Sequence, residues 1–421
     1  MSTAQEKYDA RVLAELDTFR DQTDVHDLPE IFHYWSNAKI RPRLEAFGLS
    51  CSRDMFQRYL WRQCERETSR TLRFVSIGAG NCDLEITLAQ LLKSAGCTNF
   101  VLDCLDLNEA MLERGKVAAR EAGVEAQIGF QQGDFNRWEP AHEYDAVLAS
   151  QSLHHVVNLE GLFRQVRASL APQGQFIVSD MIGRNGHQRW PEALEILQEF
   201  WKELPESYRY NRMLRRHEES YMDWDCSKQG FEGIRSQDVL PLLLSNFHFE
   251  FFFAYGNIID PFVDRAFGHH FDPSREWDRD FIDRVHQRDE EAMLAGIIKP
   301  VHLEAVLRKD PPGTLHCQQP FTPAFCMRYP DASLVAQALE SQVEQLVQEK
   351  ANLERANAEL ARARAELELN LSAVQHEKAL LAHEKAVIEQ RAATLALQMQ
   401  MASESRWLKV GNRIGVGPKF Q

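Results

Sequence analysis

A strand, a glycine turn and a helix follow one another without a break in residues 74–85, FVSIGAGNCDLE. The apolar residues 74–77 predict a buried strand, and the apolar spacing that begins at Leu84 predicts a helix. Gly78 and Gly80 stand at the turn, where a residue without a Cβ accepts a positive φ and lets a ligand approach the backbone. The stretch therefore predicts an α/β fold with a nucleotide-like ligand at the end of its first strand.

Strands and helices alternate over the following hundred residues. We expect strands at 73–77, 99–105, 127–131, 144–149 and 175–180, helices at 84–95, 109–122 and 159–170, and two later strands at 247–255 and 301–308. Strands that alternate with helices usually pair in parallel and carry helices on both faces of the sheet. The pattern predicts an α/β domain with a doubly wound, mostly parallel, seven-stranded sheet.

The remaining segments surround this sheet. We expect a helical N-terminal segment at 1–70, with helices at 5–20 and 39–66. It mainly packs on the sheet, with a cap over the mouth of the site as the alternative, and Tyr34 is a candidate for the rim of the site. The sheet domain is expected at 71–310, with helical inserts at about 181–246 and 257–300. Inserts after strands commonly form lids and substrate walls. A proline-rich linker is expected at 311–331.

Large apolar residues recur every seven positions in residues 332–403. They are Leu339, Leu346, Leu353, Leu360, Leu367, Val374, Leu381, Ile388 and Leu395. A sustained heptad predicts a coiled coil, about 85 Å long, that joins copies of the chain into a homo-oligomer. Several partner positions are polar, Lys350 and Asn357 among them, so a single solvated helix is the alternative.

Charge and composition limit the binding partners and the cellular location that we expect. The formal charge of −14 argues against nucleic acid as a partner. The eight cysteines include no CxxC pair, and the sequence contains neither a secretory signal nor a stretch that could span a bilayer. Residues 404–421 are basic around Trp407, a pattern that suits a membrane interface, with a frayed tail as the alternative. We expect a reduced, cytoplasmic protein whose tail contacts the inner face of the membrane.

Four local signals follow the predicted strands in order. They are Gly78 and Gly80 after the first strand, Asp106 with Leu107 after the second, Asp134 with Phe135 after the third, and Ser150 followed by His154 and His155 after the fourth. A carboxylate after the second strand can accept both ribose hydroxyls of a nucleotide. A carboxylate after the third strand can accept from an adenine amino group.

With this ordered set, the segment from about 72 to 180 resembles a class I S-adenosylmethionine-dependent methyltransferase. The resemblance implies S-adenosylmethionine as cofactor, held by Gly78, Gly80, Asp83, Asp106, Leu107, Asp134, Phe135 and Ser150. Ser76 stands where many members carry an acid, and Cys82 where the third glycine falls. A dinucleotide-dependent dehydrogenase is the competing class, but Asp83 would repel its diphosphate and suits an ammonium group instead.

Methyl transfer to oxygen usually needs a general base, and histidine is suited to that role near neutral pH. His154 and His155 are the candidates. Candidates for binding the acceptor are Tyr208, Tyr210, Arg215, Trp224 and Arg235, for which a purely structural helical cap is an equal alternative. No metal site is expected: His269 and His270 lie near Asp272, but adjacent histidines rarely chelate one ion well.

The order of catalytic domain, coiled coil and basic tail is similar to that of some bacterial enzymes that modify cell-surface glycans, which is an analogy of architecture. It implies O-methylation of a sugar or glycan hydroxyl in cell-surface polysaccharide biosynthesis. One alternative is a methyltransferase that acts on a small soluble metabolite, such as a quinone precursor or a polyketide. Another is a catalytically silent scaffold, which the intact Asp106, Asp134 and glycine turn oppose.

Overall fold

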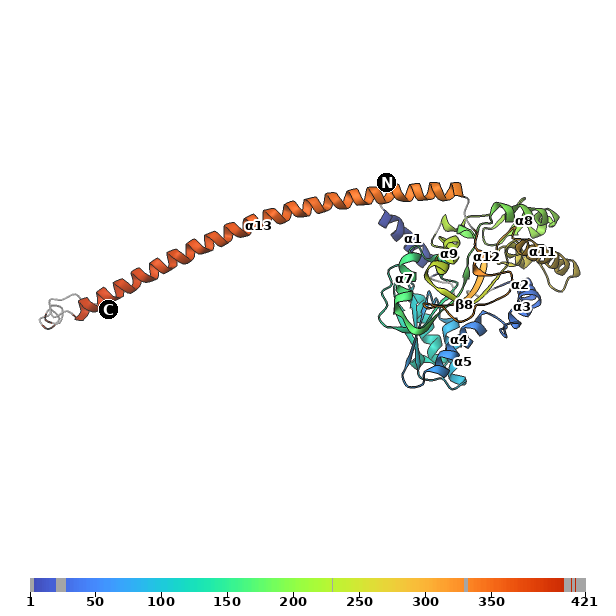
Figure 1. Cartoon of the computed structure of the whole chain (residues 1–421), viewed down its shortest axis with the longest axis horizontal. Coiled ribbons are helices and arrows are strands. Elements are labelled where there is room, and N and C mark those ends of the chain that lie inside the picture. The colour runs from blue at the N-terminus through green and yellow to red at the C-terminus, as the bar shows by residue number, and fades with distance from the viewer. Residues whose placement is uncertain are drawn as a thin grey trace. The chain divides into compact units, whose positions relative to one another are not determined.

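The computed structural model describes residues 4–19, 28–228, 230–328, 332–404, 410 and 413, without the side chains of 4, 332–346 and 349. The chain divides into two compact units, Met1–Arg328 and Tyr329–Gln421. The first unit holds the sheet and the second holds the long helix α13 (Figure 1). No described helix combines the length and the apolar character needed to cross a membrane.

An eight-stranded sheet forms the core of the first unit, in the order β10-β8-β9-β5-β4-β1-β2-β3. Its strands are β1 (Leu72–Ile77), β2 (Phe100–Asp106), β3 (Ile128–Gln132), β4 (Tyr144–Ser150), β5 (Leu170–Met181), β8 (His248–Tyr255), β9 (His302–Arg308) and β10 (His316–Cys317). β9 runs antiparallel to both β5 and β8, whereas β1 to β5 pair in parallel. The seven expected strands and their mostly parallel pairing are confirmed, and the short β10 adds an eighth strand.

Helices cover this sheet as the spacing predicted. They include α5 (Asp83–Ser94), α6 (Glu109–Glu121), α7 (Leu159–Ser169) and, from outside the alternating region, α4 (Ser52–Arg66) and α9 (Ser236–Asn246). α4 packs against α5, and α7 packs against α9. The strands β1 and β4 are almost wholly buried between these layers, which explains their continuous apolar sequence.

The prediction of one helix over 39–66 is wrong. The chain instead forms α2 (Glu30–Trp35), a π-helical stretch at Ser36–Ile40, α3 (Arg41–Glu45) and then α4. Gly48, at φ 70°, ends the first run. Its N–H donates to the carbonyl of Glu45, and the N–H of Leu49 donates to that of Leu44. This is the glycine-terminated C-cap known as the Schellman motif, and it turns the chain before α4.

The two inserts pack on each other. The first contains α8 (Pro191–Glu203) and the small hairpin of β6 (Tyr210–Asn211) and β7 (Arg216–His217), and the second contains α11 (Glu276–Leu294). Figure 1 shows α8 and α11 side by side, and the rings of Phe200 and Phe281 join them at 6.1 Å between centroids. The ion pair of Glu203 with Arg284, at 2.7 Å, joins the same helices.

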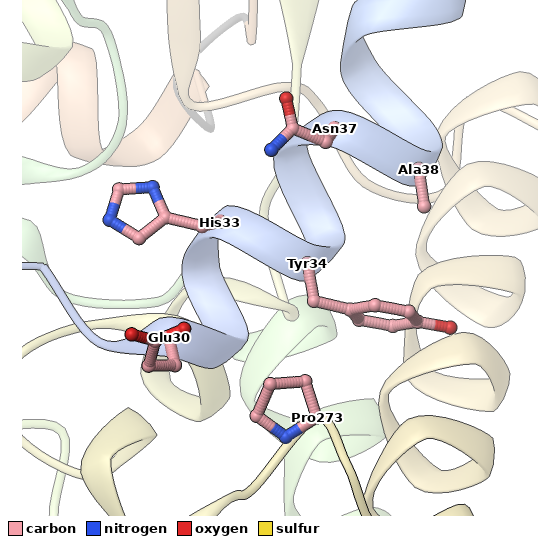
Figure 2. Close-up of a pocket in the computed structure, with 6 residues that line it drawn as sticks. All are labelled: Glu30, His33, Tyr34, Asn37, Ala38 and Pro273. Carbon is pink, nitrogen blue, oxygen red and sulfur yellow. The ribbon is translucent and has the colours of Figure 1, made fainter.

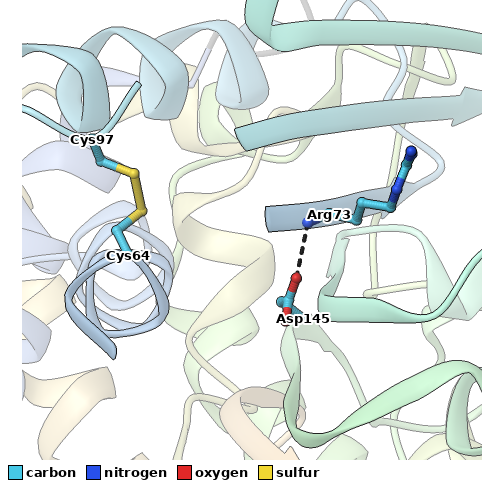
Figure 3. The surroundings of a disulfide bond; sticks show 4 residues. All are labelled: Cys64, Arg73, Cys97 and Asp145. Atoms are coloured by element: carbon cyan, nitrogen blue, oxygen red, sulfur yellow. Dashed lines mark hydrogen bonds between the residues drawn. A yellow bond between two sulfur atoms is a disulfide. The ribbon is translucent and has the colours of Figure 1, made fainter. Parts of the chain in front are cut away.

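Two cysteines that lie far apart in the sequence form a disulfide (Figure 3). Cys64 is near the end of α4 and Cys97 follows α5, so the packing of these two helices brings them together. The expectation of fully reduced cysteines is therefore wrong for this pair, while Cys317 and the buried Cys326 are free. A separation of 33 residues without a CxxC motif gave no local sign of the bond.

The second unit is dominated by one helix, α13 (Ala332–Glu404), of 73 residues. At 1.5 Å per residue it extends about 110 Å. Its heptad residues stay open to solvent in the single chain: Leu353, Leu360, Leu367, Val374, Leu381, Ile388 and Leu395 are each 59–68% exposed. The long helix is confirmed and its pairing stays a prediction. The basic tail lies almost entirely outside the described residues.

A buried carboxyl group in the core gives a stability test. Glu304 on β9 is 1% exposed, and its Oε1 accepts from the hydroxyls of Ser52 at 2.6 Å and Ser179 at 3.1 Å. Burial raises the pKa of Glu304 to about 7. The folded protein therefore binds a proton that the unfolded chain releases, and this contribution to stability is lost as the pH rises from about 4.5 to about 7.

We expect Glu304→Gln to remove that loss, because glutamine carries no charge. Relative to the native chain, the free energy of unfolding of the variant should rise by up to about 3 kcal/mol between pH 4.5 and pH 8. Urea unfolding at several pH values measures this difference, with the exposed Glu291→Gln as control. A difference between Glu304→Gln and the native chain that does not change with pH would contradict it.

Candidate active site

The glycine turn has the backbone that its sequence predicted. Gly78 and Gly80 adopt φ of 71° and 54°. A Cβ on Gly78 would come within 2.6 Å of the Cβ of Ser152, so the turn packs directly on the loop after β4. Cys82, where a third glycine was expected, also takes a positive φ of 63° and is fully buried. A Cβ on Gly115 of α6 would lie 2.9 Å from its sulfur, so the absence of a side chain there makes room for the cysteine.

Asp106, at the end of β2, is bonded to this turn. Its Oδ2 accepts from the N–H of Gly80 and its Oδ1 from the N–H of Asn108, both at 2.8 Å. Burial raises the pKa of Asp106, although these two hydrogen bonds act in the opposite direction. A carboxylate has about four acceptor positions, so this one keeps capacity for further hydroxyl donors.

A second carboxylate stands beside the turn. The hydroxyl of Ser76 donates to Glu85 Oε1 at 2.5 Å, and Glu85 is buried in α5. Burial raises the pKa of Glu85 to about 7, and its Oε2 has no hydrogen-bond partner among the described residues. A buried carboxyl group from the helix therefore adjoins position 76, where many members of the family carry an acid.

Helix α1 (Ala4–Phe19) crosses the ends of β3 and β4. Its Tyr8 hydroxyl donates to Asp134 Oδ2 at 2.7 Å, and Glu15 Oε1 lies 2.7 Å from His155 Nδ1. Asp134 also caps the turn that follows it, through the N–H of Asn136. We expected the N-terminal segment mainly to pack on the sheet. α4 contacts β4 and β5 as expected, but α1 does not follow that expectation, because its polar contacts lie at this edge.

The loop after β4 is shaped by one buried carboxylate, Asp180 of β5. Its Oδ2 accepts from the N–H groups of Ser152 at 2.9 Å and Leu153 at 2.7 Å, and its Oδ1 lies 2.7 Å from His154 Nδ1. The tight turn η4 (Leu153–His155) places the rings of His154 and His155 side by side, at 4.4 Å between centroids.

Both histidines present their second nitrogen to Glu232, which belongs to the first insert. His154 Nε2 lies 3.5 Å from Glu232 Oε1, and His155 Nε2 lies 3.4 Å from Glu232 Oε2. His187 Nε2 is closer, at 2.6 Å from Glu232 Oε1. Three histidines and a carboxylate from three separate segments therefore converge beside the glycine turn.

The charges in this cluster shift the pKa values of its members. Burial alone would lower the pKa of His154, but the charges of Asp180 and Glu232 raise it to about 10. Burial would raise the pKa of Glu232, but its hydrogen bonds with His154 and His187 hold it well below its usual value. Burial lowers the pKa of His187.

Comparison with known proteins identifies relatives of this part of the chain. Residues 75–176 match the family model of a methyltransferase domain. A stretch of 79 residues is 33% identical to the sterol 24-C-methyltransferase ERG6B of Gibberella zeae, covering 18% of this chain and 21% of that protein. The chain thus spans about a fifth of the length of this curated relative. The chain carries a class I S-adenosylmethionine-dependent methyltransferase domain.

Solved methyltransferases are similar to this domain at low sequence identity. An O-methyltransferase of a polyketide synthase multienzyme of Brevibacillus brevis, in complex with S-adenosyl-L-homocysteine, is 14% identical. It covers 68% of this chain and 81% of its own, with a TM-score of 0.37. An S-adenosylmethionine-dependent methyltransferase of Mesorhizobium loti is 17% identical over 59% of this chain and 97% of its own, with a TM-score of 0.33.

The methyltransferase domain has hydrogen-bond acceptors that match the hydrogen-bond donors of its cofactor. S-adenosylmethionine has ribose hydroxyls, an adenine amino group and an ammonium group, and the carboxylates of Asp106 and Asp134 stand at the ends of neighbouring strands β2 and β3. Leu107 and the buried Phe135 follow these two strands, Ser150 ends β4, and Asp83 is exposed at the first turn of α5. This set of hydrogen-bond acceptors therefore fits the donors of the cofactor.

The residues predicted to bind the methyl acceptor are scattered in the structure. Tyr208 donates to Asp278 at 2.8 Å, and the carbonyl of Tyr210 lies 2.7 Å from His270 Nε2, so both bind the second insert. Arg215 is exposed, and Trp224 is 41% exposed beside the guanidinium of Arg216. The guanidinium of Arg235 is engaged by Glu160 and Asp238, at 2.7 Å each, and joins α7 to α9.

Four residues of the cluster escaped sequence reasoning: Glu15, Asp180, His187 and Glu232. Asp180 had a signal, because it lies near the carboxyl end of β5, the edge where sites form in such sheets. The other three lie in α1 and in irregular parts of the first insert, where no periodic pattern points to them.

A separate surface depression lies at α2. Glu30, His33, Tyr34, Asn37, Ala38 and Pro273 line a volume of about 440 Å³. Figure 2 shows His33 and Tyr34 pointing in opposite directions from successive positions, and the Tyr34 hydroxyl lies 3.2 Å from both carboxylate oxygens of Asp283. None of the residues predicted to bind cofactor belongs to this depression, so Tyr34 lines a different surface from the glycine turn.

Asp106→Ala should weaken the binding of S-adenosylmethionine by roughly 1–3 kcal/mol, because hydroxyl donors and the N–H groups of Gly80 and Asn108 lose their acceptor. Isothermal titration calorimetry measures the change. Glu109→Ala, which removes an exposed carboxylate from the first turn of α6, is the matched control and should keep native affinity. Unchanged affinity in Asp106→Ala would show that the ligand lies elsewhere.

Proposed function

We propose that this protein transfers a methyl group from S-adenosylmethionine to a hydroxyl oxygen. The observation that carries the proposal is the convergence of His154, His155 and Glu232 beside the glycine turn. Ser152 packs on Gly78 in the same loop, and the charges of Glu15 and His155 act on Asp106. Groups that can assist loss of a proton therefore adjoin the groups that would hold the cofactor.

The chain's own residues would position both partners of the reaction. Asp106 and Asp134 would accept from the ribose hydroxyls and the adenine amino group, and the glycine turn leaves the backbone accessible. When bound, the cofactor supplies an electrophilic methyl group on a sulfonium. α1 and the first insert would exclude water from this edge of the sheet, since Glu15 and Glu232 contact the loop after β4.

A hydroxyl acceptor must lose its proton, and the histidine–carboxylate cluster is suited to assist. His155 is oriented by Glu15 at Nδ1 and presents Nε2 toward Glu232. Its side chain is 12% exposed, compared with 5% for His154, so His155 is the more accessible of the two. We infer that His155 is the group of this pair that meets the acceptor.

We further propose a sugar or glycan hydroxyl as the acceptor, as in surface polysaccharide synthesis. The groups that converge at the cluster are imidazoles and carboxylates, which hydrogen-bond to a polyol. A quinone-like or polyketide acceptor would favour a mainly apolar lining. The long α13, with its exposed heptad residues, is consistent with an enzyme held in an assembly.

Turnover tests the role of the cluster. With methyl-labelled S-adenosylmethionine and lysate fractions, we expect label in the polysaccharide or lipid-linked fraction. His155→Ala should reduce the rate by about 10²–10⁴-fold, the usual contribution of acid–base catalysis. His248→Ala, at an exposed position at the start of β8, is the control and should keep the native rate.

Label in small molecules instead would make this a metabolite enzyme. An undiminished rate in His155→Ala would contradict the role of the cluster. Cofactor binding without label in any fraction would contradict methyl transfer itself and favour a scaffold.

We also propose that α13 pairs with α13 of a second copy. Leu360 and Leu367 are 67% and 68% exposed, and they share one face of the helix with the other heptad residues. Burial of such a stripe against an identical one is the usual driving force of a coiled coil. The ion pair Arg364–Glu368, at 3.0 Å, stabilises the single helix along its surface.

Leu367→Glu should convert the assembly to monomers or weaken it strongly, because a charge would enter the apolar seam. Light scattering coupled to gel filtration measures the mass. The matched control is Leu369→Glu, which changes an equally exposed leucine (73%) two residues away, on another face of α13. A native chain that is monomeric at high concentration would refute the pairing.

A further inference from the structure

We propose that His154, His155 and Glu232 form a binding site for one divalent transition-metal cation. The site rests on the geometry of these residues alone. Only the role assigned to the cation in catalysis rests on the proposed O-methyl transfer. Among the described residues, this is a set of three whose ligand atoms all lie within 4.8 Å of one another.

The spacing of the ligand atoms fits an ion. Zinc binds imidazole nitrogen and carboxylate oxygen at about 2.0–2.2 Å, so neighbouring ligand atoms around one ion lie about 3–3.5 Å apart. His154 Nε2 and Glu232 Oε1 are 3.5 Å apart, and His155 Nε2 and Glu232 Oε2 are 3.4 Å apart. Both distances are longer than the usual hydrogen bond between nitrogen and oxygen, which is about 2.9 Å.

The two histidines are each held at the ring nitrogen that faces away from the ion, and Glu232 has a further partner at one of its oxygens. Asp180 Oδ1 lies 2.7 Å from His154 Nδ1, and Glu15 Oε1 lies 2.7 Å from His155 Nδ1. His187 Nε2 lies 2.6 Å from Glu232 Oε1. Metal-binding histidines typically donate their other N–H to a carboxylate in this way, and a cation that binds displaces any proton on the nitrogen that faces it.

Adjacent histidines were expected to be poor chelators, and the local backbone explains why this pair differs. The turn η4 stacks the two rings at 4.4 Å instead of sending them to opposite sides. Asp180 fixes that turn through the N–H groups of Ser152 and Leu153. His269 and His270 with Asp272 do not form such a set among the described residues.

The ligand set indicates which cations bind. Two imidazoles and one carboxylate suit zinc, manganese, iron or cobalt better than magnesium or calcium, which prefer oxygen ligands. Three protein ligands leave coordination positions open. With a cation bound, both ring nitrogens of His155 are engaged, and the cation takes over the part that the proposed function gives to this histidine. The acceptor hydroxyl takes an open position, its oxygen binds the cation, and the weakened O–H bond releases its proton to water.

Direct metal binding tests the site without reference to activity. The full-length protein is freed of metal with a chelator, and Zn²⁺, Mn²⁺ and Co²⁺ are titrated separately by calorimetry. We expect one equivalent of at least one cation to bind, with d–d absorption bands when Co²⁺ binds. His155→Ala and Glu232→Gln should each weaken this binding at least tenfold, and Asp180→Asn about 10–100-fold.

His248→Ala is the control and should bind metal as the native chain does. Because Glu232 is 40% exposed and His155 12% exposed, their variants should fold, which circular dichroism checks. Stoichiometric binding lost in both variants supports the site, even if no methyl transfer is found. Absence of binding, or binding that both variants retain, overturns it, and methyl transfer by the metal-free enzyme would then leave the proposed function intact.

Discussion

The buried carboxylate of Asp180 is the interaction on which the site depends. It is fully buried, yet it accepts from backbone N–H groups at Ser152 and Leu153 and bonds to the ring of His154. Burial would raise the pKa of Asp180, but the charge of His154 holds it below its usual value. An ionised group in the core is stable only with such partners. Because these partners belong to the loop after β4, any conformation of the loop that removes them leaves a buried charge unpaired. The loop is therefore held in one conformation.

That fixed loop lets distant segments complete the site. Glu15 of α1 contacts His155, and its other oxygen accepts from the N–H of Phe231 in the first insert. Arg11 donates to the carbonyl of Ser227 at 2.7 Å and so joins the same two segments. These contacts hold the part of the first insert that carries Glu232. The loop after β4 thus carries the two histidines, whereas α1 and the first insert supply the carboxylates of Glu15 and Glu232 that contact them.

The parts that the sequence predicted are those with local causes. The strands, Asp106 and the glycine turn follow from apolar runs and backbone conformation within a few residues. The break at Gly48 was missed because a C-cap outweighed the apolar spacing of 39–66. The Cys64–Cys97 bond and Glu232 were missed because they depend on tertiary packing. Arg235 was a candidate for binding the methyl acceptor, but Glu160, 75 positions away, engages it.

The walls of the site differ in how firmly they are held. The first insert is anchored by buried aromatic residues such as Trp201, whose ring packs on Phe267 at 4.9 Å. Helix α1 has no fully buried side chain in residues 5–19, and its Leu13 is 68% exposed. It is held instead by the polar contacts of Tyr8, Arg11 and Glu15. Elements with little buried apolar area open at the lowest free-energy cost. Of these two walls, α1 is therefore the one that moves away from the loop after β4 most readily.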